Sequence, residues 1–208
     1  MNTELNSKIL DVATRMFLQY GYKHTTVDQI VSAVGIAKGS FYLHYPSKDA
    51  VFAAVSGQVC GQVLGEMAKI ASSDMSVEAK LHEVHRGAYL YIWDFCHQAP
   101  HAPVLWAELL QAAAVYTGPA HAQGQTIIAG IIREGQAQGL FDATLDADIA
   151  ARLIQLATEG FSPPYQLIDS RERIEDELPL LVDLLIRGLR QASFSAMPAT
   201  DKERSGPQ

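Results

Sequence analysis

A group of side chains between residues 38 and 44 has the chemistry needed to bind double-stranded DNA. Lys38 can neutralise a phosphate or donate hydrogen bonds to the O6 and N7 atoms of guanine. Ser40 and His44 can hydrogen-bond to base edges or phosphates, and Leu43 can contact a thymine methyl group. The hydroxyl group of Tyr42 can reach a phosphate. Together these side chains form a set that is suited to DNA.

Three further residues complete the predicted DNA interface. Gly39 is a poor helix former that costs about 1 kcal/mol relative to Ala, so its presence indicates a close backbone approach to the duplex or to a neighbouring helix. Thr26 and Lys48 lie at predicted helix starts, where backbone N–H groups and the helix dipole favour phosphate. The predicted DNA contacts are therefore Thr26, Lys38, Gly39, Ser40, Tyr42, Leu43, His44 and Lys48.

The elements that must position these side chains are three helices near the N-terminus. The first is predicted from about Leu5 to Tyr20, with Gly21 as a left-handed cap. The second begins at Thr26, where a capping box can form, and breaks at Gly35. The third runs from about residue 37 to residue 45 and ends against a proline, which gives a helix-turn-helix. Apolar residues at core spacing turn the DNA-binding set outward: Val27, Ile30, Val34, Ile36, Phe41 and Tyr45.

Residues 9 to 52 contain an ordered run of motifs: Gly21-Tyr22, Thr25-Thr26-Val27, Ile30, Gly35, the block from Lys38 to Tyr42, and Pro46-Ser47-Lys48. With this run they resemble the DNA-binding domain of the TetR family of repressors. The resemblance implies a homodimer, an N-terminal three-helix head, and a C-terminal helical domain that binds a small molecule and thereby loses affinity for its operator. A weaker resemblance continues from Ile132 to Ala151 and does not identify the ligand.

The rest of the chain predicts an all-α fold of about nine helices, because apolar residues recur at intervals of three and four and no strand-like alternation is present. We predict a DNA-binding domain over residues 1–47, a ligand-binding and dimerisation domain over residues 48–193 and a disordered tail over residues 194–208. Beyond the head, helices are expected near residues 47–70, 76–98, 103–116, 119–138, 146–162 and 174–192.

Two of these helices carry more apolar surface than one core requires. Residues 149–161 have one stripe with Ile149, Leu153 and Leu156 and a second with Ile154 and Phe161. The last helix repeats this pattern, which predicts a two-fold, four-helix interface between two copies and therefore a palindromic operator. The alternative is a pair of helices fully buried inside one chain. The two stripes of the last helix are Leu178, Leu181, Val182, Leu185 and Leu189, and Leu180, Leu184 and Ile186.

The helix near residues 76–98 has two stripes. The first is a plain core stripe of Leu81, Val84, Ala88, Ile92 and Phe95, and the second is amphiphilic, with His82, His85, Tyr89, Trp93 and Cys96 on one face. With residues of other helices this face can form an apolar pocket with a few polar anchors, as is typical of small-ligand sites. The alternative is that these are ordinary core aromatics. The predicted ligand-binding residues are Met67, Tyr89, Trp93, Trp106, Leu109, Ile131 and Phe161.

Several other classes of function are disfavoured. His82 and His85 are three residues apart and do not form the HExxH metal motif, and no nucleophile with an orienting base or phosphate-binding glycine loop is present, so we expect no metal, no cofactor and no enzymatic activity. Cys60 and Cys96 are interpreted as structural thiols, with oxidant sensing as the alternative. No apolar run is long enough to cross a membrane, and a cytoplasmic location fits two cysteines without a signal segment.

The charge distribution agrees with a DNA-binding head. The chain has a net charge of −7, but residues 1–50 carry +1 and the remainder −8, which favours contact with DNA through the N-terminal segment. We therefore predict a ligand-responsive, sequence-specific repressor that acts as a homodimer and is released from a palindromic operator by a small-molecule effector. The alternative is an all-helical interaction module that does not bind DNA.

Overall fold

The computed structural model describes residues 3–108, 118–161 and 171–190, and all regular secondary structure in these ranges is helical. The predicted all-α fold, with a helix-turn-helix head followed by a larger helical domain, is confirmed. Residues 102–108 are also helical. The remaining helices are α1 (Thr3–Tyr20), α2 (Val27–Val34), α3 (Lys38–His44), α4 (Lys48–Ala71), α5 (Val77–His97), α7 (Gly118–Ala137), α8 (Ala147–Thr158), η1 (Glu159–Phe161) and α9 (Arg171–Leu189).

The head consists of α1, α2 and α3, and its helix ends follow from local sequence. Gly21 and Gly35 both adopt left-handed backbone conformations, with φ of +82° and +80°, that end α1 and α2. Thr26 and Gln29 form the predicted capping box, in which the backbone N–H of Gln29 donates to the Thr26 hydroxyl at 3.2 Å. The core beneath the helices is closed by Ile30 and Phe41, both fully buried.

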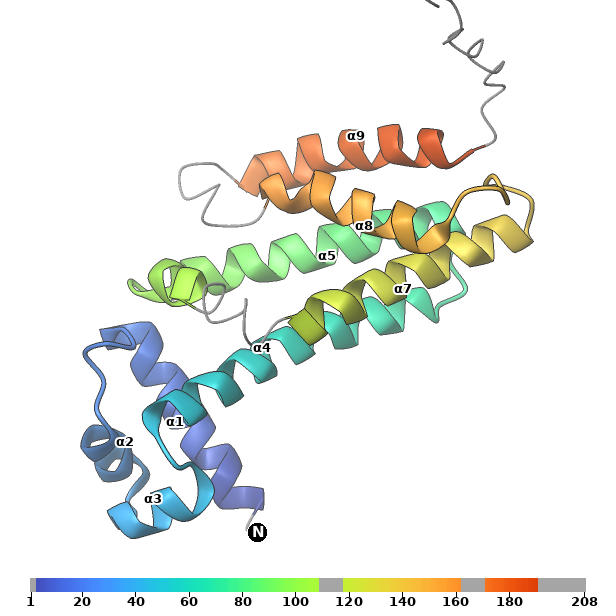
Figure 1. Cartoon of the computed structure of the whole chain (residues 1–208). Coiled ribbons are helices and arrows are strands. Elements are labelled where there is room, and N and C mark those ends of the chain that lie inside the picture. Colours follow the sequence, from blue (N-terminus) through green and yellow to red (C-terminus); the bar gives the residue numbers. More distant parts are fainter. Residues whose placement is uncertain (1–2, 109–117, 162–170, 191–208) are drawn as a thin grey trace, which may run out of the picture.

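The body is built in layers around α5 and α7. Figure 1 shows α4 leaving the head and running along one side of α5 and α7, while α8 and α9 cover the other side. Ser47 caps α4 by accepting a hydrogen bond from the backbone N–H of Ala50 at 3.1 Å. Because α4 has no break between Lys48 and Ala71, one uninterrupted helix connects the head with the body.

The predicted boundaries need small corrections. The third helix spans Lys38–His44, because the backbone at residues 37 and 45 is extended. The last helix begins at Arg171 and tolerates Pro179 in its interior. The helix predicted over 103–116 is described only for residues 102–108, and the predicted tail over 194–208 lies outside the described residues.

The turn after α7 lies within the weaker resemblance and accounts for two of its glycines. Gly139 has φ of +71°, which turns the chain so that the Phe141 ring packs directly against Gly135. A Cβ atom placed on Gly135 would lie 2.2 Å from the Phe141 ring. The glycine at 135 is therefore required by a close contact between a helix and an aromatic ring.

Candidate functional site

The outer face of α3 is the candidate DNA interface. Lys38, Gly39, Tyr42 and Leu43 are exposed, and Leu43 retains 83% of its accessible surface although it is a large apolar side chain. Phe41, between them in sequence, points into the core. Ser40 and His44, also predicted DNA contacts, are half-buried at the edge of this face. The helix therefore presents the predicted set outward, with the two half-buried members at its margin.

Lys38 is held in an ion pair at the start of α3. Its Nζ lies 2.7 Å from Oδ1 of Asp28 on α2, and both side chains are largely exposed. The hydrogen bond to this carboxylate raises the pKa of Lys38 above its usual value. The ammonium group is thus charged and at the surface, but Asp28 competes with any phosphate or base that approaches it.

Gly39 has open space around its missing side chain. A Cβ atom there would meet no described atom within 4 Å beyond its own helix and chain neighbours. Close packing against a neighbouring helix, one of the two explanations offered by the sequence, is therefore corrected. The other explanation, a close approach to the duplex, stays a prediction.

Lys48 and Thr26 serve the construction of the head in this structure. Nζ of Lys48 donates to the backbone oxygens of Tyr22 and Thr25 at 2.8 and 2.9 Å and lies 4.1 Å from the centroid of the Tyr22 ring. The Tyr22 hydroxyl donates in turn to Asp49. The Thr26 hydroxyl is occupied by the capping box. Sequence reasoning missed this clamp, because the receiving carbonyl oxygens belong to a turn more than twenty residues away.

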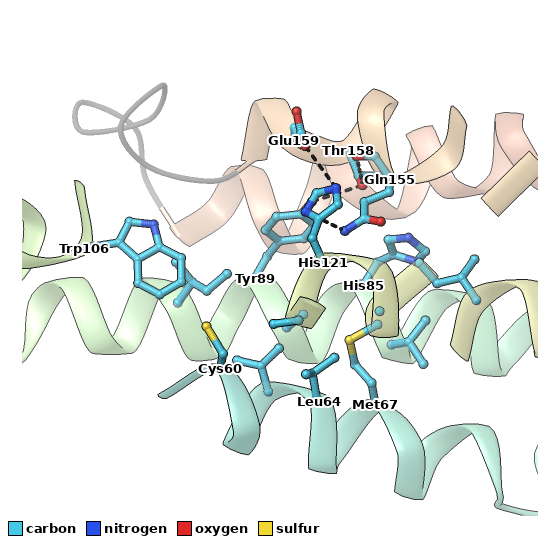
Figure 2. A pocket seen from close by; sticks show the side chains of 17 residues that line it. Cys60, Leu64, Met67, His85, Tyr89, Trp106, His121, Gln155, Thr158 and Glu159 are labelled. Atoms are coloured by element: carbon cyan, nitrogen blue, oxygen red, sulfur yellow. Dashed lines mark hydrogen bonds and ion pairs between the residues drawn. The ribbon is translucent and has the colours of Figure 1, made fainter. Parts of the chain in front are cut away.

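A cavity of about 340 Å³ lies in the body between α4, α5, α7 and α8 (Figure 2). Its wall is mostly apolar, with side chains of α4 on one side and a group of polar side chains on the opposite side. This size and composition are typical of small-molecule sites. The lining residues are Cys60, Val63, Leu64, Met67, Val84, His85, Ala88, Tyr89, Ile92, Trp106, Ala120, His121, Gly124, Ile128, Gln155, Thr158 and Glu159.

The predicted ligand-binding set agrees with this cavity only in part. Met67, Tyr89 and Trp106 line it, whereas Leu109 lies outside the described residues. Three other predicted residues do not line the cavity, which corrects their placement: Trp93, Ile131 and Phe161.

Each of the three misplaced residues has a different physical reason. The cavity reaches Ile92 on α5, and the indole of Trp93 instead stacks on the His97 ring with centroids 3.7 Å apart. Ile131 is buried in the core one helical turn beyond the last lining residue of α7. Phe161 does not line the cavity, and its ring contacts that of Tyr89, with centroids 6.3 Å apart.

The polar residues of the cavity include several that the sequence did not single out. His121, Gln155 and Glu159 come from α7, α8 and η1, and Figure 2 shows them gathered at one side together with Thr158 and Tyr89. His121 Nε2 lies 3.8 Å from Glu159 Oε1, and its Nδ1 lies 3.2 Å from the Gln155 amide nitrogen. Each is an isolated polar residue on an amphipathic helix, so no local pattern distinguished them.

One outer face of the body is apolar and without cover from the described chain. Leu153 of α8 and Leu184 of α9 retain 55% and 63% of their accessible surface. The sequence placed Ile186 beside Leu184, but Ile186 is buried, which corrects that stripe. The alternative of helices buried all round does not describe these helices. The exposed apolar face of α8 and α9, as we use the term, consists of Ile149, Leu153, Leu156, Leu180 and Leu184.

The segment before and within residues 102–108 connects the cavity with the head. Trp106 lines the cavity, while the backbone N–H of His101 donates to the Leu18 carbonyl oxygen of α1 at 3.2 Å. Two residues beyond Trp106, the Glu108 carboxylate lies 3.7 Å from Nζ of Lys23. A displacement of Trp106 therefore has a short mechanical route to the end of α1.

The two histidines considered for a metal site face different surroundings. His82 faces Asp183 of α9, with Nε2 2.9 Å from Oδ1, whereas His85 faces the cavity. Within the described residues no group of three or more potential ligands is placed to hold a metal ion. Of the two cysteines, Cys60 lines the cavity and Cys96 is buried, and burial raises the pKa of both thiols.

Comparison with protein families and curated proteins identifies relatives over most of the chain. Residues 9–55 match the model of bacterial regulatory proteins of the tetR family. The HTH-type transcriptional repressor KstR2 of Rhodococcus jostii is 25% identical over 153 residues, which is 72% of this chain and 74% of that protein. The HTH-type transcriptional repressor DhaR of a Mycobacterium species (strain GP1) is 25% identical over 197 residues, or 88% of this chain and 93% of that protein.

Solved structures share the fold. A crystal structure of a TetR-family transcriptional regulator from Mesorhizobium loti superposes with a TM-score of 0.68 at 17% identity, covering 89% of this chain and 96% of that one.

None of the helices in the described ranges is both long and apolar enough to span a membrane.

Proposed function

The chain belongs to the TetR family of bacterial transcriptional regulators, and we propose that it is a ligand-responsive repressor that binds a palindromic operator as a homodimer. The observation that carries this proposal is the outward face of α3, which presents Lys38, Tyr42 and Leu43 within the segment that matches the family model. A large apolar side chain that is 83% exposed beside a lysine and a tyrosine is suited to a major groove, where thymine methyl groups and phosphates are accessible together.

The exposed apolar face of α8 and α9 supports the homodimer. Its members come from two adjacent helices, and a contiguous apolar surface of this kind normally marks an interface. If the occupant is a second copy, a two-fold axis pairs α8 and α9 with their equivalents in a four-helix contact. The same axis presents two copies of α3 to DNA, which is why a palindromic operator is expected.

The cavity supports regulation by a small molecule. Cys60, Leu64 and Met67 place α4 in the cavity wall, and the opposite end of the same helix holds the head through the Lys48 clamp. A ligand that displaces α4 or Trp106 therefore changes the separation of the two heads. To relieve repression it must bind the DNA-incompetent arrangement more tightly than the competent one.

The proposal is tested by selecting fragments of the source genome with the purified protein at near-physiological salt and sequencing what is retained. We expect enrichment of an inverted repeat, and the variant Leu43→Asp should lose this enrichment while remaining folded. Retention without a shared symmetric sequence, equally sensitive to salt in both proteins, indicates only nonspecific binding. That result favours the alternative of an all-helical interaction module.

A further inference from the structure

His85 places an unpaired hydrogen-bond acceptor in the wall of the cavity. Its side chain is on α5, only 4% of the residue is exposed, and Nδ1 lies 2.7 Å from the Leu81 carbonyl oxygen. Because that oxygen can only accept, Nδ1 must carry a hydrogen. Burial lowers the pKa of the imidazole, which keeps the ring neutral and leaves Nε2 unprotonated. Nε2 is buried and has no hydrogen-bond partner among the described residues.

The neighbouring hydroxyl groups in the wall have already committed their hydrogens. Tyr89 donates to Oγ1 of Thr158 at 3.0 Å, and Thr158 donates to backbone oxygens of its own helix at 3.1 Å. The Tyr89 oxygen keeps a lone pair but has no hydrogen to offer. Burial raises the pKa of Tyr89 to about 12, so it stays a neutral hydroxyl group.

A second unpaired acceptor lies in the lining of the same cavity. Gln155 turns its amide nitrogen toward His121, and its Oε1 is buried without a partner in the described part of the chain. A buried acceptor without a donor costs free energy, and two of them in one cavity are unusual unless a bound molecule supplies the hydrogens. The described lining residues thus supply no donor to these two acceptors.

The charges around the cavity also restrict the ligand. Glu159 contributes a carboxylate, and the described lining residues include no lysine or arginine. An anionic ligand would meet the carboxylate of Glu159, which is half-exposed and lies 3.8 Å from His121 Nε2, and no lysine or arginine of the described lining, which disfavours its binding.

We infer that the cavity binds a largely apolar molecule carrying a hydroxyl or amino group, and that His85 Nε2 accepts a hydrogen bond from that group. Carboxylates and phosphates fit the described lining least well. The inference rests on the proposed function in assigning the cavity to an effector, and it adds the chemical class of that effector.

The test compares matched probes on the full-length chain. Decan-1-ol, decylamine, 1-methoxynonane and decanoate have similar length but differ in the group that they offer: a neutral donor, a cationic donor, only an acceptor, and an anion. Binding is followed by calorimetry and by tryptophan fluorescence, since Trp106 lines the cavity. We expect the alcohol or the amine to bind about tenfold more tightly than the ether, because the donor probes make one buried hydrogen bond that the ether cannot make. Decanoate should bind most weakly.

Variants assign the effect to His85. His85→Phe should reduce the affinity for the donor probes to that of the ether and leave the ether unchanged, whereas His85→Gln, whose amide oxygen can accept, should restore part of the preference. Leu64→Ala is the matched control. It lines the same cavity from α4 and should weaken all probes alike without changing their ratio.

Three outcomes overturn the inference: equal affinity for the alcohol, the amine and the ether, tightest binding of decanoate, or binding of none of the probes. DNA selection with the same preparations, without any probe, keeps the two proposals apart. Normal operator binding with no donor preference overturns only the ligand class. A donor preference without operator binding overturns the proposed function and leaves the chemistry of the cavity intact.

Discussion

The head and the body use their cores in opposite ways. In the head the core is filled, with the rings of Phe17, Tyr22 and Phe52 packed against one another at centroid distances of 4.4 to 6.0 Å, and the groups with functional chemistry point outward from α3. In the body a cavity of about 340 Å³ interrupts the core, and its polar groups point inward. Recognition of DNA by the head thus depends on the side chains exposed on α3. Recognition of a ligand by the body depends on the unpaired hydrogen-bond acceptors inside its cavity.

This difference separates the consequences of mutation. Substitutions on the outer face of α3 are expected to change DNA affinity and leave folding intact, because those side chains make few contacts inside the chain. Substitutions in the body are expected to change packing, assembly or ligand response. The four predictions that follow test this separation.

The largest effect is expected from charges on the exposed apolar face of α8 and α9. The double variant Leu153→Glu with Leu184→Glu should be monomeric, because four buried carboxylates would meet across a two-fold axis. Each head would then bind alone, and the affinity for the selected operator should fall about a hundredfold or more. Light scattering measures the assembly, and fluorescence anisotropy with labelled operator measures the affinity.

The matched control for this variant is Leu140→Glu. Leu140 is similarly exposed, at 46%, but lies in the turn after α7, outside that face. It should change neither assembly nor affinity. An operator affinity that survives in a monomeric double variant would contradict the homodimer.

The two glycines at 39 and 135 give the clearest contrast between the regions. Gly135→Ala should lower the free energy of unfolding by about 1–3 kcal/mol, because its Cβ atom would overlap the Phe141 ring. Gly39→Ala should leave the free energy of unfolding unchanged or raise it by up to about 1 kcal/mol, since the position is open and helical. Urea unfolding at fixed protein concentration measures both values.

Gly39→Ala also tests the predicted close approach of the α3 backbone to the duplex. If the α3 backbone lies close to the duplex, Gly39→Ala should weaken operator binding although it does not destabilise the head. Unchanged operator affinity would mean that the glycine has no such role.

The third prediction concerns the competition between Asp28 and DNA for Lys38. Lys38→Ala should weaken operator binding about tenfold and relax the preference at particular bases. Asp28→Asn should have the opposite sign and tighten binding a few-fold, because it frees the ammonium group and removes a negative charge next to the phosphates. Anisotropy titrations at several salt concentrations measure both. Weaker binding of Asp28→Asn would show that the ion pair positions Lys38 for DNA.

The head was predictable because its instructions are local. The capping box at Thr26, the left-handed glycines at 21 and 35 and the core spacing of Ile30 and Phe41 each act over a few residues. Even so, the inward turn of Lys48 could not be anticipated, since its partners are carbonyl oxygens of a turn that only the folded head brings near.

The cavity was predictable only in outline because it is assembled from distant segments. On α5 its wall follows neither of the two stripes that the sequence suggested: it takes Val84 and Ile92 from the expected core stripe and His85 and Tyr89 from the amphiphilic one. Where a cavity ends along a helix depends on the rotation and crossing of its neighbours. The periodicity of one helix cannot encode this, and Trp93 was therefore misplaced.

The smallest expected effect is the pH dependence that His85 gives to stability. The folded chain lowers the pKa of His85 through burial, whereas the unfolded chain leaves it near its ordinary value of 6.5. Above that value both states are neutral. As the pH falls below it, the unfolded chain takes up a proton that the folded chain refuses, so the free energy of unfolding decreases by at most about 1.4 kcal/mol per pH unit.

His85→Gln removes this linkage, so the difference in free energy of unfolding between the parent chain and the variant should shrink as the pH is lowered from 7.5 to 5.5. His82, the neighbouring histidine that acts on the His85 pKa, is present in both proteins, and its own contribution cancels in the comparison. Urea unfolding at each pH measures the difference. A constant difference would mean that the folded and unfolded chains protonate His85 equally, so that below its ordinary pKa Nε2 becomes a donor facing the cavity, which reverses the hydrogen-bond chemistry expected of the ligand.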